Sequence, residues 1–210
     1  MSIVPDRVAK STRGGIAPIA LRLHALGVSA NAVTVLGFLL TVSGAALLAS
    51  GQPGPALVVL LLGTLSDAVD GQIARAAGGG TRFGAFLDST LDRLSDAALA
   101  ISAVYLGTTV PLGTALASTL SFWSGLALLV ASFQVSYIRA KAESLGEGAS
   151  VGLAPREARI ALFLIGVAAW AATGTFLLFA AAVALAAFLA TVTVIQRIAH
   201  MASALNEKKG

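Results

Sequence analysis

The 210-residue chain contains no cysteine and few charged residues. The absence of cysteine excludes disulfides, thiolate-ligated metals and a cysteine nucleophile, and it leaves the redox compartment undetermined. Charged residues make up 11% of the chain, against about 25% in ordinary soluble domains. No polar stretch is long enough to form a separate soluble domain, and no tandem repeat is present. The N-terminus is basic but lacks a signal-peptide core, so we expect no cleaved leader.

Apolar residues take up 57% of the sequence, with a mean hydropathy of +0.87. The apolar stretches lie at about 31–50, 55–77, 84–107, 112–138, 157–173 and 175–196. Each has close to the roughly 20 residues that a transmembrane helix needs. We therefore predict an all-α integral membrane protein with six transmembrane helices, forming a single domain over residues 1–210. Within it, 1–28 would be a cytoplasmic or interfacial segment, 29–199 the helix bundle and 200–210 a cytoplasmic tail.

The segment 16–28, ahead of the first span, mixes apolar residues with Arg22 and His24. It is too short to cross a bilayer, and its composition predicts an amphipathic helix in the membrane interface. An ordinary lead-in helix that packs on the bundle is the alternative. His24 has no histidine or acid spaced to join it as a ligand, so we assign it to the interface.

The basic residues indicate the orientation. All 14 of them fall in the N-terminal segment, around the second–third and fourth–fifth connections, or after the last span. They are Arg7, Lys10, Arg13, Arg22, Arg75, Arg82, Arg93, Arg139, Lys141, Arg156, Arg159, Arg197, Lys208 and Lys209. By the positive-inside rule, both termini and these connections lie in the cytoplasm, in a multi-pass protein of the cell (inner) membrane.

Half of the ten acidic residues lie between residues 67 and 96. Asp67 and Asp70 are three residues apart, and Asp88, Asp92 and Asp96 are four apart, so each set lines one face of its helix. Charged residues inside a membrane are costly, which makes them a functional hypothesis by default. The Gly-rich connection at 78–80 reverses the chain, so we expect the two acidic faces to meet near the cytoplasmic ends.

Converging carboxylates repel one another unless a cation neutralises them. Oxygen ligands without cysteine favour Mg²⁺ or Mn²⁺, with Ca²⁺ also possible. Two such ions bridged by carboxylates would stabilise a phosphoryl-transfer reaction. Arg93 is expected to act as a counter-charge, and Asp96 to pair with Arg93 or with another arginine in a structural role.

The motif Asp67-x-x-Asp70-Gly71-x-x-Ala74-Arg75, followed after eight residues by Gly84-x-x-x-Asp88-x-x-x-Asp92, resembles the signature of the CDP-alcohol phosphotransferases. The segment from Ser29 to Gly37 is similar to that family's TPNxxTxxG segment, although its first two positions differ. The resemblance implies a six-helix membrane enzyme that joins an alcohol to a CDP-activated lipid and releases CMP.

The resemblance also assigns roles to residues. It implies that Asp67, Asp70, Asp88 and Asp92 ligate two Mg²⁺ or Mn²⁺ ions, with Asp92 also the general base. The CDP-lipid would be bound by Asn31, Thr34, Gly71, Ala74, Arg75, Thr81 and Gly84. A homodimer is implied as well, and nothing indicates a nucleic-acid partner.

Basic residues around the fourth–fifth connection point to the acceptor. Arg139, Lys141, Arg156 and Arg159 would form a phosphate-binding clamp, since arginine makes bidentate phosphate contacts. Taken alone, these charges are equally explained as positive-inside residues. The run Asp88-Ser89-Thr90-Leu91-Asp92-Arg93-Leu94-Ser95-Asp96 is most similar to prokaryotic phosphatidylinositol-phosphate synthases, which implies CDP-diacylglycerol as donor and inositol 1-phosphate as acceptor.

Two alternatives stay open at this point. A phosphatidylglycerophosphate synthase, which uses glycerol 3-phosphate, would have the same metal chemistry. A membrane transporter would also use intramembrane carboxylates, but the sequence lacks the paired broken helices typical of one. The sequence leaves undetermined whether the lipid is diacylglycerol- or archaeol-based, which metal binds in the cell, and the organism.

Overall fold

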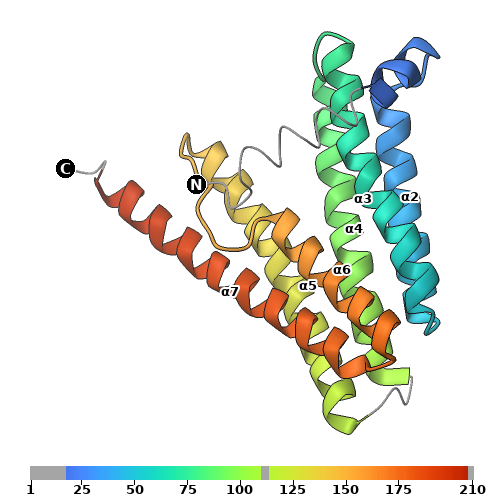
Figure 1. Cartoon of the computed structure of the whole chain (residues 1–210). Helices are drawn as coiled ribbons and strands as arrows, with labels where there is room; N and C mark the ends of the chain where they lie inside the picture. The colour runs from blue at the N-terminus through green and yellow to red at the C-terminus, as the bar shows by residue number, and fades with distance from the viewer. Residues whose placement is uncertain (1–17, 110–113, 208–210) are drawn as a thin grey trace. The chain divides into compact units, whose positions relative to one another are not determined.

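The computed structural model describes residues 18–109 and 114–207, and every regular element in them is a helix (Figure 1). Residues 18–25 form a short helix ahead of α2. The long helices are α2 (Ala30–Ala49), α3 (Pro53–Ala76), α4 (Arg82–Thr109), α5 (Ala115–Ser144), α6 (Arg156–Thr173) and α7 (Phe176–Glu207). The all-α prediction is therefore confirmed. Arg7, Lys10, Arg13, Lys208, Lys209 and the turn expected at 110–113 lie outside the described residues.

Two helices continue well past their predicted ends. α5 runs to Ser144, beyond the apolar stretch that ends near 138, and α7 runs to Glu207, beyond its apolar limit near 196. Residues 200–207, predicted to be a tail after the bundle, are thus part of α7. The helix ends were predicted too early because hydropathy marks only the strongly apolar part of a helix, whereas these extensions mix charged and polar side chains with helix-forming alanines. The cytoplasmic location of the tail stays a prediction.

Four of the described helices are long and apolar enough to cross a membrane: α2, α3, α5 and α7. α4 and α6 fall outside this set because they contain the charged residues of the acidic motif and of the basic clamp. The chain therefore has the helices of an integral membrane protein, while six crossings stay a prediction.

The described chain divides into two compact units. The first comprises residues up to Ser43 together with Val59–Ser95, and so holds most of α2 and α3 and the first half of α4. Glycine brings α2 and α3 together: a Cβ on Gly63 would lie 2.7 Å from the hydroxyl of Thr41 and 3.2 Å from the carbonyl oxygen of Gly37. Small residues allow this close backbone approach in membrane helices.

The short helix 18–25 also belongs to this first unit. Ala20 is buried in an apolar cluster with Val33 of α2 and with Val69 and Ile73 of α3. The segment thus packs on the bundle, which is the lead-in alternative. Its location in a membrane interface stays a prediction.

The second unit comprises Gly44–Val58 and the chain from Asp96 onward. Within it, α7 packs against both α5 and α6. Edge-to-face aromatic contacts join α6 to α7, with ring centroids of Phe163 and Phe179 5.2 Å apart and those of Trp170 and Phe176 5.1 Å apart. This aromatic core fixes the register of α6 against α7, and so the position of the arginines in the first turn of α6.

Candidate active site

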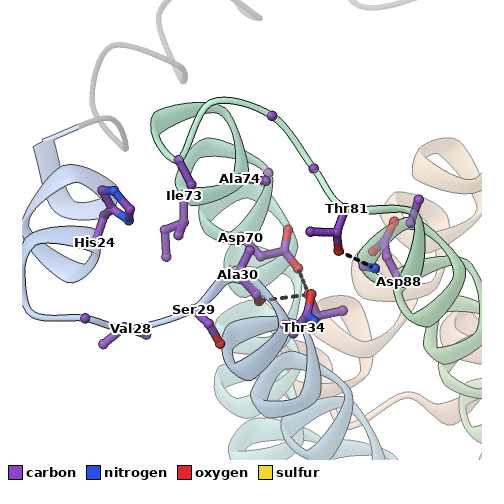
Figure 2. Close-up of a pocket in the computed structure, with 18 residues that line it drawn as sticks. His24, Val28, Ser29, Ala30, Thr34, Asp70, Ile73, Ala74, Thr81 and Asp88 are labelled. Atoms are coloured by element: carbon purple, nitrogen blue, oxygen red, sulfur yellow. Dashed lines mark hydrogen bonds between the residues drawn. The ribbon is translucent and has the colours of Figure 1, made fainter.

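A cavity of about 500 Å³ lies in the first unit, at the end of the bundle where α2 and α4 begin and α3 ends. Its lining includes two carboxylates, Asp70 and Asp88, which Figure 2 shows on neighbouring helices. The other lining residues are His24, Gly27, Val28, Ser29, Ala30, Asn31, Thr34, Gly71, Ile73, Ala74, Ala77, Gly79, Gly80, Thr81, Gly84 and Ala85. The cavity therefore combines the Ser29–Thr34 segment with both halves of the acidic motif.

Asp70 is held by Thr34. The hydroxyl of Thr34 lies 2.7 Å from Oδ2 of Asp70 and 3.0 Å from the carbonyl oxygen of Ala30 (Figure 2). Both side chains belong to buried residues. A hydrogen bond to an ionised carboxylate is among the stronger ones in proteins, so this contact fixes Asp70 across the α2–α3 interface.

Asn31 reaches from α2 to α4 at Gly84. A Cβ on Gly84 would lie 2.9 Å from Oδ1 of Asn31, so any larger residue there would displace the amide. Thr81 caps this helix, since its hydroxyl accepts a hydrogen bond of 2.9 Å from the backbone N–H of Gly84. Asn31, Thr81 and Gly84 are all lining residues of the cavity.

The four motif carboxylates are not equivalent. Asp70 and Asp88 line the cavity, whereas Asp67 and Asp92 are absent from its lining. Asp67 lies close enough to Asp70 for charge–charge interaction. Its Oδ1 also faces Gly37 of α2, since a Cβ added to Gly37 would lie 3.2 Å from that oxygen. Asp92 pairs with Arg93 at 3.7 Å, as expected for a counter-charge.

The cavity suits a divalent cation by its charge. Its described lining has two carboxylates but no lysine or arginine, so a bound cation would favour the binding of an anionic ligand there. All the acidic donors are hard oxygens, which fits Mg²⁺ or Mn²⁺. Among the described residues, however, no three acidic or histidine side chains are close enough to hold one ion. The carboxylates therefore have the right chemistry, and a ligand or water would complete the coordination.

Six of the seven residues expected to bind the CDP-lipid line this cavity. They are Asn31, Thr34, Gly71, Ala74, Thr81 and Gly84. The seventh, Arg75, is exposed and is not among the lining residues. Its guanidinium lies beside Gly71, since a Cβ added to Gly71 would lie 3.7 Å from Nη1 of Arg75.

The expected basic clamp lies in the second unit, and the structure ties two of its members to one acid. Asp96 accepts hydrogen bonds from Arg156 at 3.3 Å and from Arg159 at 3.0 Å. Asp96 thus pairs with clamp arginines, one of the two partners expected from the sequence. Arg139 pairs with Glu143 at 2.9 Å on the exposed side of α5, and Lys141 is also exposed.

Sequence reasoning missed two residues of these sites. His24 was assigned to the interface, yet it lines the cavity (Figure 2). Arg197 was counted only as a cytoplasmic charge, yet it is buried, donates to the carbonyl oxygens of Val135 and Val151, and lies within electrostatic range of Arg139 and Arg159. Neither residue stands in a spaced motif, so the sequence offered no signal for either.

Comparison with known proteins identifies relatives along most of the chain. The model of the CDP-alcohol phosphatidyltransferase family matches residues 27–203. An archaetidylinositol phosphate synthase of Pyrococcus horikoshii is 34% identical over 181 residues, covering 86% of this chain and 87% of that protein. One of Methanothermobacter thermautotrophicus is 38% identical over 186 residues, covering 89% and 88%.

A solved structure is also similar. The phosphatidylinositol phosphate synthase of Mycobacterium tuberculosis with CDP-DAG bound matches with a TM-score of 0.78 and 32% identity, covering 87% of this chain and 91% of that chain. The same synthase in complex with manganese and citrate matches with a TM-score of 0.78 and 32% identity, covering 87% of both chains.

Proposed function

The chain belongs to the CDP-alcohol phosphatidyltransferase family, and on this premise we propose that it transfers a phosphatidyl group from CDP-diacylglycerol to the hydroxyl of inositol 1-phosphate. The products are phosphatidylinositol phosphate and CMP. Family membership confirms the sequence prediction that the chain is an enzyme, a transferase of phospholipid synthesis.

The observation that supports this proposal most directly is the lining of the cavity. Two motif carboxylates and six residues expected to bind a CDP-lipid converge on one space of about 500 Å³. Gly71 and Gly84 leave room for a ligand to approach the backbone. We infer that the cytidine diphosphate binds there, with Asn31 and Thr34 as polar contacts.

The metal supplies electrostatic chemistry. We propose that Asp67, Asp70, Asp88 and Asp92 would hold two Mg²⁺ or Mn²⁺ ions, whose positive charge would offset the negative charge of the diphosphate and of the leaving phosphate. The bound manganese in the mycobacterial relative supports this choice of ion. The hydrogen bond from Thr34 fixes one ligand, Asp70, in advance.

Asp92 is the proposed general base. A carboxylate oxygen of Asp92 takes the proton from the acceptor hydroxyl, and the hydroxyl oxygen forms a bond to the lipid-side phosphorus. The bond from that phosphorus to the CMP oxygen breaks, and CMP leaves with the electron pair. Asp92 lies one helical turn after Asp88, which lines the cavity, so both carboxylates project from one face of α4.

The phosphate of the acceptor is the proposed ligand of Arg139, Lys141, Arg156 and Arg159. Asp96 holds the guanidinium groups of Arg156 and Arg159 in place, and a fixed guanidinium binds phosphate with less loss of side-chain entropy. The relatives named as inositol phosphate enzymes support inositol 1-phosphate over glycerol 3-phosphate. We also propose that the site and both termini face the cytoplasm and that the enzyme is a homodimer.

The proposal is tested by CMP release from purified protein with Mg²⁺ or Mn²⁺. CDP-diacylglycerol and CDP-archaeol are compared as donors, and inositol 1-phosphate, glycerol 3-phosphate, free inositol and serine as acceptors. We expect turnover with CDP-diacylglycerol and inositol 1-phosphate, none with free inositol, and loss of turnover after chelation that returns with added metal.

Other outcomes would correct specific parts of the proposal. Preference for glycerol 3-phosphate would retain the metal chemistry and overturn the acceptor. Preference for CDP-archaeol would change only the donor lipid. Turnover that persists after complete chelation would overturn the metal assignment.

A further inference from the structure

The connection between α5 and α6, residues 145–155, lies along α7 and is bonded to it at four points. The carbonyl oxygen of Gly148 lies 3.1 Å from Nε2 of His200. The carbonyl oxygen of Val151 accepts from Nε of Arg197 at 3.0 Å. The backbone N–H of Leu153 donates to Oε1 of Gln196 at 3.1 Å, and that of Ala154 donates to the hydroxyl of Thr193 at 2.9 Å. The four α7 residues follow one face of the helix.

The contact at Thr193 is the most deeply buried of the four, since Thr193 and Ala154 are both 0% exposed. The threonine hydroxyl donates to the carbonyl oxygen of Leu189 at 2.8 Å while it accepts from Ala154. α6 begins only at Arg156, and its N-cap Pro155 makes no side-chain cap bond. The buried N–H of Ala154 therefore relies on α7 for its partner.

The carbonyl group of the same residue holds an arginine. Nη1 of Arg159 donates to the carbonyl oxygen of Ala154 at 3.0 Å, and Nη2 donates to Asp96 at 3.0 Å. The guanidinium is thus fixed at two points, one on α4 and one on the backbone of Ala154. Because a guanidinium is planar, two such bonds determine its orientation.

Gly152 shows how closely the connection follows Thr193. Its φ is +133°, a conformation that favours glycine, and a Cβ there would overlap Cγ2 of Thr193. The backbone of the connection therefore rests on the methyl group of the same side chain whose hydroxyl binds Ala154.

We propose that Thr193 is a positioning residue for the acceptor site. It sets the orientation of the Arg159 guanidinium by fixing the backbone of Ala154, although it is itself no ligand of substrate. This inference rests on the proposed role of Arg159 in binding the acceptor phosphate. Nothing in the motif or the basic clamp includes Thr193, and the contact joins residues 39 apart in sequence.

The test compares Thr193→Val, Thr193→Ser and Thr191→Val in the purified full-length enzyme. Valine removes the hydroxyl and keeps the shape, serine keeps the hydroxyl, and Thr191 is a matched control because it is exposed and its hydroxyl bonds only within α7. We expect Thr193→Val to raise the KM for inositol 1-phosphate about tenfold, with little change in the KM for CDP-diacylglycerol or in kcat. Thr193→Ser should keep the KM for inositol 1-phosphate close to the wild-type value.

Hydrogen exchange and an Arg159 variant distinguish an error in the role of Thr193 from an error in the proposed acceptor site. We expect faster deuterium uptake over residues 150–155 in Thr193→Val and a raised acceptor KM in Arg159→Gln. Unchanged uptake in Thr193→Val, or an unchanged acceptor KM despite faster uptake, would overturn the positioning role of Thr193. An unchanged acceptor KM in Arg159→Gln would overturn the proposed acceptor site, and the inference with it.

A parallel loss of kcat and of both affinities in Thr193→Val would show a merely structural role and would also overturn the inference.

Discussion

Asp92 and Asp88 occupy successive turns of α4, yet only Asp88 lines the cavity. In the proposed mechanism Asp92 has a proton-transfer role in addition to ligation, whereas Asp88 is a ligand only. A base must lie within hydrogen-bond reach of the acceptor hydroxyl, and that hydroxyl enters only with the second substrate.

Asp92→Asn is predicted to reduce CMP release at least about a thousandfold, because asparagine cannot accept the proton. Binding of CDP-diacylglycerol, measured without acceptor, should be largely retained. Glu157→Gln, an isosteric change of an exposed carboxylate on α6, is the matched control and should keep wild-type turnover. Near wild-type turnover in Asp92→Asn would show that another group is the base.

Asp96→Asn is predicted to lower the free energy of unfolding by about 3 kcal/mol, because it leaves buried arginine charge without its partner. The side chains of Asp96 and Arg159 are 10% and 5% exposed. Glu143→Gln is the control, since Glu143 and its partner Arg139 are 58% and 59% exposed, and it should change stability by less than about 0.5 kcal/mol. Denaturation in detergent measures the free energy of unfolding of both variants. An equal decrease in Asp96→Asn and Glu143→Gln would show that the buried ion pair contributes no more than the exposed one.

Among the helices, α2 and α3 depend on glycine where they meet. Gly63→Ala is predicted to destabilise the protein by about 1–3 kcal/mol, because the added methyl group meets backbone atoms of Gly37 and Thr41 that cannot move aside easily. Gly54→Ala is a control on the same helix, where a Cβ meets nothing within 4 Å. That change should be close to neutral, because the helix preference of alanine is offset by Pro55, which disfavours the helical conformation in a preceding residue with a Cβ.

The Gly63 prediction is checked by thermal denaturation of both variants in the same detergent. If Gly63→Ala were as stable as Gly54→Ala, the two helices would not be held as closely as the structure has them.

At the scale of the whole molecule, the absence of cysteine allows the orientation to be mapped with single introduced thiols. The positive-inside pattern predicts that the connection between α5 and α6 faces the cytoplasm and that between α2 and α3 faces outward. A membrane-impermeant maleimide should therefore label Glu147→Cys only in inverted vesicles and Gln52→Cys only in intact cells. The reverse pattern would invert the topology and place the site outside.

Local sequence patterns were sufficient to predict most of the helices and the family. Hydropathy located the helices to within a few residues at most ends, because the preference of apolar side chains for a membrane interior is a property of each stretch of chain. The spacing of Asp67 to Asp92, with its glycines, was enough to predict the family. That motif and the segment from Ser29 to Gly37 together contain the six expected CDP-lipid residues that line the cavity.

Tertiary structure alone decided which partners these residues have. Thr34 holds Asp70 across 36 residues, Asp96 joins Arg159 across 63, and Thr193 receives Ala154 across 39. Periodicity records which face of a helix a residue occupies, but not the register at which two helices pack, because many side chains fix that register together. The acidic motif could therefore be identified from the sequence, whereas the contacts that hold Arg156 and Arg159 became visible only in the packed helices.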